Sequence, residues 1–159
     1  MKEIIIRQAT REDAKSIHKL CMCSIKELYK GFYSDNIIHG LTDNKAPENW
    51  FSAIDRNILF VAIKDSEIVG FGGAIPGEIW AIYVLPSHIK SGIGTILLRH
   101  AMEIALIEKS NITVESSLNA AGFYAKNGFV ELERKTARHG AVELPVILMG
   151  YKPPLKEKS

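Results

Sequence analysis

Cysteine is scarce in this sequence of 159 residues, which contains two. Both Cys21 and Cys23 fall in a segment with helical spacing, where side chains two positions apart point about 200° away from each other and cannot form a disulfide. No partner cysteine or histidine cluster follows at a zinc-type spacing. We therefore interpret the two as reduced thiols in a reducing compartment and expect no metal site.

The net charge is also small, and the apolar runs are short. A formal net charge of +2 is too small to favour nucleic acid or a membrane surface. Basic residues are dispersed apart from the RKTARH segment (134–139) and the lysine-rich tail. No apolar run approaches membrane-spanning length, and the N-terminal EIIIRQA lacks a signal-peptide pattern. We expect a cytoplasmic protein with no nucleic-acid partner and no membrane partner.

What is present is the composition of one globular domain, with 47% hydrophobic and 24% charged residues. Alternating and apolar runs predict strands, and a 3.6-residue period predicts helices between them. The predicted strands are 3–9, 58–63, 68–75, 78–85, 111–116, about 129–138 and 142–151. The predicted helices are 10–30, 34–40, 47–56, 92–109 and 119–128.

This order of elements predicts a mixed α/β fold with helices on both faces of a mostly antiparallel sheet. One pair should be parallel, because a helix crosses from the strand at 78–85 to the strand at 111–116. At the local level Thr10 is expected to cap the first long helix with Asp13 in its first turn, and Gly40 is expected to end the short second helix.

The most informative stretch is YVLPSHIKSGIGTILLR, residues 83–99. It is typical of a strand end, a short loop and a helix that starts at two closely spaced glycines. The start of a helix leaves unpaired backbone N–H groups and a partial positive charge, and glycine removes the Cβ that would keep a ligand away. The stretch therefore predicts a phosphate site at 89–95. A glycine-rich turn that binds nothing is the alternative.

Two segments together resemble the GCN5-related N-acetyltransferases, the GNAT family. The family pattern has V-x-P, then (Gln or Arg)-x-x-Gly-x-(Gly or Ala), then a helix; here these are Val84 to Pro86 and Ile89 to Gly94. A later pattern, N-x-x-A-x-x-F-Y-x-x-x-G-F, is similar to NAAGFYAKNGF at 119–129. The position that is usually Gln or Arg is Ile89, which leaves the pyrophosphate to Lys90 or to backbone N–H groups.

The resemblance implies one acetyltransferase domain at 1–152, followed by a polar tail at 153–159. It implies acetyl-CoA as cosubstrate, held between the two parallel strands, and a small-molecule, peptide or protein amine as acceptor, with a homodimer as a common family assembly. The cofactor-binding residues that it implies are Ile82, Tyr83, Val84, Ile89, Lys90, Ser91, Gly92, Ile93, Gly94, Thr95, Asn119, Tyr124 and Lys126.

Direct attack by an amine needs three chemical groups. Tyr124 is expected to protonate the departing thiolate, because a phenol donates a proton without carrying charge beforehand. Backbone N–H groups at 82–84 are expected to stabilise the oxyanion. Glu78 is the expected base, through water if needed. The family places the acceptor near the aromatic residues of the 29–57 region, so the predicted substrate-binding residues are Tyr29, Phe32 and Tyr33.

Other interpretations stay open at this stage. Tyr124 could be a core residue, Glu78 an exposed strand end and Asn119 only a helix cap. The histidines at 88, 100 and 139 are assigned no role, and the basic residues of 134–138 are expected in a solvated turn. A non-catalytic acyl-CoA sensor would share the fold. A dinucleotide site is a further alternative, since G-x-G-x-x-L is close to G-x-G-x-x-G and Glu115 ends the next strand.

Overall fold

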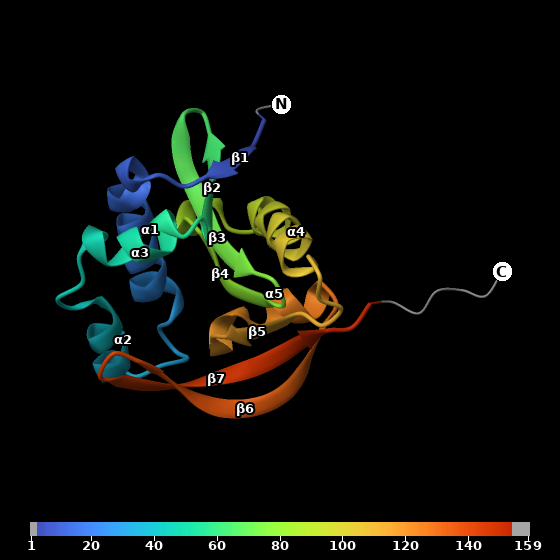
Figure 1. Cartoon of the computed structure of the whole chain (residues 1–159). Coiled ribbons are helices and arrows are strands. Elements are labelled where there is room, and N and C mark those ends of the chain that lie inside the picture. The colour runs from blue at the N-terminus through green and yellow to red at the C-terminus, as the bar shows by residue number, and fades with distance from the viewer. Residues whose placement is uncertain (1–2, 154–159) are drawn as a thin grey trace.

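The computed structural model describes residues 3–153 and contains a seven-stranded sheet with helices on both faces (Figure 1). The strand order is β1-β2-β3-β4-β5-β7-β6, and every neighbouring pair is antiparallel except β4 and β5. This confirms the predicted fold class, including its parallel pair. The strands are β1 (Ile5–Gln8), β2 (Leu59–Lys64), β3 (Glu67–Ile75), β4 (Glu78–Val84), β5 (Thr113–Ser116), β6 (Phe129–His139) and β7 (Val142–Tyr151).

The helices divide between the two faces of the sheet (Figure 1). Helices α1 (Ala14–Leu28), α2 (Asp35–Thr42) and α3 (Phe51–Asp55) cover one face, and α4 (Ile93–Ala105) and α5 (Ala121–Lys126) cover the other. Each face therefore has its own hydrophobic core. Short 3₁₀ segments η1 (Arg11–Asp13), η2 (Pro47–Trp50), η3 (Pro86–His88) and η4 (Leu118–Ala120) connect the elements. No helix of the described residues is long and apolar enough to cross a membrane.

The sheet excludes the dinucleotide alternative. A dinucleotide fold needs a parallel sheet built from repeated β-α-β units. Here α4 links the single parallel pair, and that pair lies within an otherwise antiparallel sheet.

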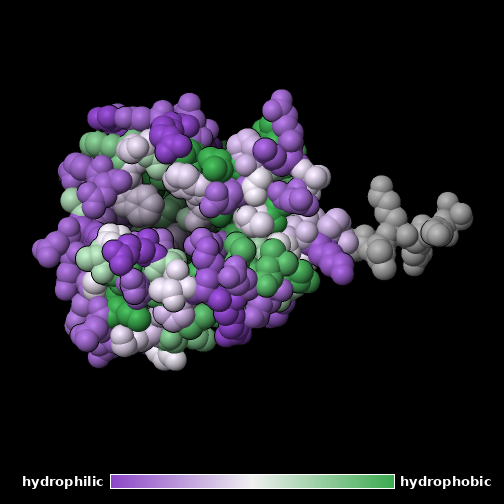
Figure 2. Space-filling model, turned by 60° about the horizontal axis from the view of Figure 1, so that its bottom comes forward, coloured by the Kyte–Doolittle hydropathy of each residue, from purple (hydrophilic) through white to green (hydrophobic). Residues whose placement is uncertain are grey.

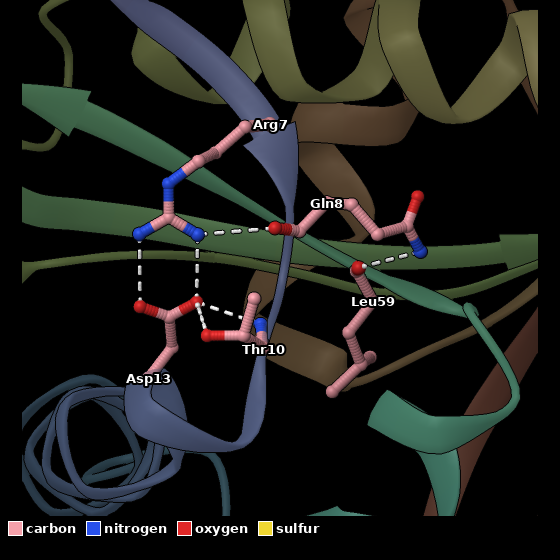
Figure 3. Close-up of polar contacts among 5 residues, drawn as sticks. All are labelled: Arg7, Gln8, Thr10, Asp13 and Leu59. Atoms are coloured by element: carbon pink, nitrogen blue, oxygen red, sulfur yellow. Dashed lines mark hydrogen bonds and ion pairs between the residues drawn. The ribbon is translucent and has the colours of Figure 1, made fainter.

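The first long helix is fixed at its start by Asp13 (Figure 3). Its carboxylate accepts two hydrogen bonds from the Arg7 guanidinium, at 2.7 and 2.9 Å, and a third from the backbone N–H of Thr10 at 2.8 Å. Gln8 joins β1 to the neighbouring strand by donating to the carbonyl of Leu59. Thr10 caps the 3₁₀ turn η1 that leads into α1, with Asp13 as its capping-box partner, and Asp13 rather than Thr10 is the N-cap of α1 itself.

Two predicted helix ends are wrong. Helix α2 continues past Gly40 to Thr42, because the glycine serves packing: a Cβ there would lie 2.5 Å from a methyl group of Val142 on β7. Helix α4 ends at Ala105 rather than near Lys109, and Ile107, which lies in the predicted helical range, is exposed beyond its end. The N-cap of α2 is Ser34, the first residue of the predicted range, whose hydroxyl accepts from the Ile37 N–H.

The feature that positions the site is the way in which β4 leaves β5. These two parallel strands pair at only two positions, Glu78 with Thr113 and Ile79 with Val114. A bulge follows at once, because the register against β3 passes from Ala74–Ile79 to Gly73–Ala81 and leaves Trp80 as the extra residue. Beyond the bulge β4 pairs with β3 alone, so its other edge is open.

Candidate functional site

The gap between β4 and β5 belongs to a cavity of about 810 Å³ that collects residues from both faces of the sheet. Figure 2 shows a hollow in the molecular surface with hydrophilic residues along much of its rim. On the α4–α5 face the cavity is lined by Ile82, Val84, Ile89, Lys90, Gly92, Gly94, Thr95, Asn119, Ala120, Gly122, Phe123, Tyr124, Lys126 and Asn127. On the α1–α3 face and within the gap it is lined by Ser24, Leu28, Tyr29, Phe32, Trp80, Ala81, Tyr83, Glu115, Ser116, Ser117, His139, Leu144 and Val146.

The open edge of β4 presents backbone groups to the cavity. Leu85 donates its N–H to the Val69 carbonyl, so the hydrogen-bonded pairs with β3 are those of Leu85, Tyr83 and Ala81. The N–H and C=O groups of Ile82 and Val84 therefore point the other way, into the gap. An extended ligand could pair with these two residues as a strand would. The backbone of Tyr83, also predicted to bind the cofactor, is used by β3, and its side chain faces the cavity instead.

The glycine loop forms the far end of the cavity. Gly92 caps α4 in the left-handed conformation, with a φ of 89°, and a Cβ at this residue would meet no atom within 4 Å. The first N–H groups of α4 lie beside it, without partners inside the helix. Gly94 has a different reason to be glycine, because a Cβ there would come within 3.1 Å of the Phe123 ring. Of the two glycines, Gly92 leaves open space beside the start of α4, and Gly94 allows α4 to pack against α5.

Cationic side chains supplement these N–H groups. Lys90 and Lys126 line the cavity from the loop and from α5. Ile89, which stands where the family has Gln or Arg, lines it with an exposed fraction of 44%. The predicted residues Ser91 and Ile93 do not line the cavity: the Ser91 hydroxyl donates to the His88 carbonyl, and Ile93 is buried in the core.

Asn119 carries an unsatisfied polar atom in this cavity. Its Oδ1 is buried and has no hydrogen-bond partner. The interpretation as a helix cap is wrong, because Ser117 is the N-cap of η4 and Ala120 that of α5. A buried amide oxygen without a partner costs about 1–3 kcal/mol, which a donor group of a ligand would relieve. In the family pattern the asparagine stands seven residues before the tyrosine. In this chain that position is Ser117 rather than Asn119, and Ser117 also lines the cavity.

Tyr124 approaches the gap from α5 and is 4% exposed. Burial raises the pKa of its hydroxyl, and the neighbouring Tyr29 raises it further. The phenol therefore stays protonated far above neutral pH. Tyr124 on α5 and Tyr29, the C-cap of α1, thus lie close enough to interact across the sheet.

Tyr29 and Tyr83 complete a group of three phenols. Their hydroxyl oxygens are 3.4 Å apart. Burial raises the pKa of Tyr29, opposed by hydrogen bonds to Tyr83 and Ser117, and burial likewise raises the pKa of Tyr83, with Tyr29 and then Cys21 adding to it. Burial also raises the pKa of the free thiol of Cys21 to about 12. The centre of the cavity is therefore uncharged and supplies hydroxyl donors.

The predicted acceptor residues divide into two groups. Tyr29 and Phe32 line the cavity, and Phe32 is 53% exposed at its edge. Tyr33 does not line it. Its hydroxyl donates to the Pro145 carbonyl at 2.6 Å and accepts from the Leu118 N–H at 2.9 Å. It joins β7 to η4 and is occupied by that structural task.

Glu78 does not line the cavity, although it was the expected base. It is exposed at the paired end of β4, before the bulge and away from the open edge. The structure instead brings in Trp80, Glu115 and His139, which sequence reasoning missed or assigned to another role. For Trp80, a large aromatic residue inside an apolar predicted strand was a usable sequence signal. The other two depend on strand register, which local patterns do not give.

Comparisons with known proteins agree with this geometry. Residues 55–131 match the acetyltransferase (GNAT) domain. The uncharacterized N-acetyltransferase YafP of Escherichia coli (strain K12) is 25% identical over 104 residues, which are 65% of this chain and 67% of that protein.

Two solved structures are similar over almost the whole chain. A GCN5-related N-acetyltransferase of Rhodopseudomonas palustris superposes with a TM-score of 0.85 at 26% identity, covering 96% of this chain and 98% of that one. The PaiA N-acetyltransferase of Thermoplasma acidophilum, in complex with coenzyme A, gives a TM-score of 0.75 at 25% identity, covering 95% and 99%.

Fold and cleft together define an acyltransferase in which an open strand edge and a helix start share one cavity. The chain belongs to the GNAT acetyltransferase family.

Proposed function

We propose that the protein transfers the acetyl group of acetyl-CoA to a primary amine by direct attack in a ternary complex. The observation that carries the proposal is the open edge of β4, which ends at the glycine loop on one side and reaches the buried phenol of Tyr124 on the other. A ligand with amide groups in its arm and phosphates at one end matches that sequence of groups.

The residues of the α4–α5 face would hold this cosubstrate. The N–H groups from Lys90 to Thr95 would bind the diphosphate, with Lys90 and Lys126 as counter-charges. Ile82 and Val84 would pair with the extended arm, and Asn119 Oδ1 would accept from one of its N–H groups. Acetyl-CoA supplies an acetyl thioester at the end of that arm.

The chain's own groups would then act on the transfer. The amine nitrogen forms a bond to the acetyl carbon, the carbon–sulfur bond breaks, and the Tyr124 hydroxyl donates its proton to the departing thiolate. The proton that the amine nitrogen loses on becoming an amide would return Tyr124 to its neutral form. A backbone N–H at 82–84 would stabilise the oxygen that becomes negative. The N–H groups of Ile82 and Val84 face the gap, and that of Ile82 lies nearer the bulge.

The amine must lose a proton before it attacks. For a lysine-like amine of pKa near 10.4, neutralisation at pH 7 costs about 4.6 kcal/mol. Glu78 lies on the same strand as the gap but outside the cavity, so any part that it takes in this step runs through water. The proton of the amine would leave the cavity through water.

A turnover screen tests the proposal. Acetyl-CoA is offered with a panel of amines, and the release of free thiol is followed. We expect at least one amine to give thiol well above the rate without amine, and acetyl-CoA to raise the melting temperature because it binds only the folded chain. Stabilisation by acetyl-CoA with no turnover on any amine would instead support the acyl-CoA sensor. Absence of stabilisation at millimolar acetyl-CoA would contradict both.

A further inference from the structure

The charges that line the cavity are sorted by face. Lys90 and Lys126 lie at the end formed by the glycine loop and α5. Among the residues that the structure describes, Glu115 is the one carboxylate in the lining. A single negative group in a cavity whose other charges are positive marks the place where a cationic part of a ligand gains most.

Strand register places Glu115 on the face opposite to the predicted cosubstrate. It stands directly across from Leu148 on β7. Residues two positions apart on a strand share a face, and Val146 on the same strand packs in the core beneath α1 and α2. Val114 and Ser116 alternate with it, and Val114 belongs to the core of α4 and α5. The Glu115 carboxylate therefore faces the side from which an acceptor would enter.

Its height along the gap is equally informative. Glu115 is the first residue of β5 after the two positions that pair with β4, so it lies where the gap begins, level with the bulge at Trp80. The glycine loop lies at the other end of β4. A ligand anchored by its phosphates at the loop would have its reactive end near the closed end of the gap, close to Glu115.

The surroundings of Glu115 limit the body of the acceptor. The lining on this face is largely apolar and aromatic, with Leu28, Phe32, Trp80, Leu144 and Val146. Lys135 lies 3.4 Å from the Glu115 carboxylate, with both side chains about two-fifths exposed. One carboxylate can compensate one ammonium, and the adjacent lysine disfavours a second positive charge on the acceptor.

Resting on the function proposed above, we infer that Glu115 binds the protonated amine of the acceptor, and that the acceptor is a monocationic primary amine on an apolar body. A polyamine would bring a second ammonium toward Lys135. The carboxylate draws the amine to the closed end of the gap before the amine loses its proton.

The test compares 1-aminohexane with 1,6-diaminohexane, two acceptors of similar length that differ by one charge. We expect kcat/KM for the monoamine to exceed that for the diamine by about tenfold, which corresponds to 1.4 kcal/mol. Glu115→Gln should raise KM for 1-aminohexane about tenfold, with kcat changed less than threefold, and Glu115→Asp should recover part of the loss. Lys135→Met should narrow the difference between the two acceptors.

Glu133→Gln is the matched control, because Glu133 stands across from the same Leu148 on β6 but does not line the cavity. It should leave both KM values unchanged. Circular dichroism and the acetyl-CoA-induced rise in melting temperature report whether each variant is folded and binds cosubstrate. A Glu115 that served only as an ion-pair partner of Lys135 would lower stability without raising KM.

Calorimetry of 1-aminohexane with the coenzyme-A-loaded protein separates this inference from the proposed function. Binding that is lost in Glu115→Gln, without product from any amine, keeps the inference and overturns the transferase. Product formation with unchanged kinetics in Glu115→Gln keeps the transferase and overturns the inference. Preference for the diamine, or no binding and no acetylation of 1-aminohexane by the parent protein, also overturns the inference.

Discussion

The two faces of the sheet are built in different ways. The α4–α5 face takes its lining groups from two short segments: the open edge of β4 with the loop and the start of α4, and then η4 with α5. The α1–α3 face collects single side chains from α1, β4, β5, β6 and β7. Backbone amides on the first face suit one fixed ligand, whereas side chains on the second can change one at a time. Cosubstrate binding and acceptor choice should therefore respond to different substitutions.

The largest expected effect comes at the residue that connects the two faces. Tyr124→Phe keeps the ring packing against Phe123 and Phe129 but removes the hydroxyl. We expect kcat to fall at least about 100-fold, the lower range for loss of a positioned proton donor. The Kd for acetyl-CoA, measured by calorimetry, should change less than twofold. Equal losses in kcat and in cosubstrate binding would show that Tyr124 acts on the cosubstrate face alone.

Asp13→Asn tests the hydrogen bonds that fix the start of α1, on the α1–α3 face. It removes the charge that binds Arg7 and the Thr10 N–H, and we expect unfolding to become easier by about 1–3 kcal/mol at pH 7. Hydrogen bonding to Arg7 lowers the pKa of Asp13 in the folded chain. Its stabilisation is therefore complete above the ordinary carboxyl pKa of about 3.9 and is lost as pH falls through the lowered folded value.

Urea unfolding of the parent and of Asp13→Asn at several pH values measures this effect. The difference between the two proteins should be largest near neutral pH and should narrow below about pH 4, as the parent's carboxylate protonates. A difference that stayed constant with pH would mean that the hydrogen-bond geometry, rather than the charge, stabilises the start of α1.

Gly92→Ala addresses the cosubstrate face. There is open space for the added methyl group, so the cost is conformational: an L-residue at this φ loses about 1–2 kcal/mol. Relief of that strain would turn the N–H groups of the loop, and we expect the Kd for acetyl-CoA to rise about tenfold while the amine KM stays within twofold. Ser91→Ala, next to it in the loop, should leave both constants close to those of the parent.

The smallest expected effect is that of Tyr33→Phe, which tests a residue near the acceptor face that carries no proposed binding role. Loss of its bonds to Pro145 and Leu118 should cost about 1–2 kcal/mol in unfolding free energy. The amine KM should not change. A raised KM with unchanged stability would return Tyr33 to the acceptor site, where the sequence had placed it.

The same contrast explains what the sequence could predict. The fold class, the parallel pair and the glycine loop rest on local patterns, and the structure agrees with each. Gly40 misled because it looks like a helix end in sequence, whereas its contact with Val142 lies a hundred residues away.

The acceptor side could not be predicted for a related reason. Glu115 and His139 enter the cavity only because β5, β6 and β7 pair in one particular register. A shift of one residue would turn each of these side chains to the other face. Tyr33 shows the converse, since it lies four residues from Tyr29 and yet supports the fold while Tyr29 lines the cavity.

One contact on β4 limits how far a guest chain can shift along the strand. The hydroxyl of Ser24 on α1 donates to the Val84 carbonyl at 3.2 Å, on the open edge. The Val84 carbonyl thus already accepts one hydrogen bond from the protein, which favours pairing of an arriving arm with the carbonyl of Ile82, two residues nearer the bulge. Helix α1 would thereby set the alignment of a ligand on the opposite face. Ser24→Ala would permit a second alignment displaced by about 7 Å, the length of two strand residues.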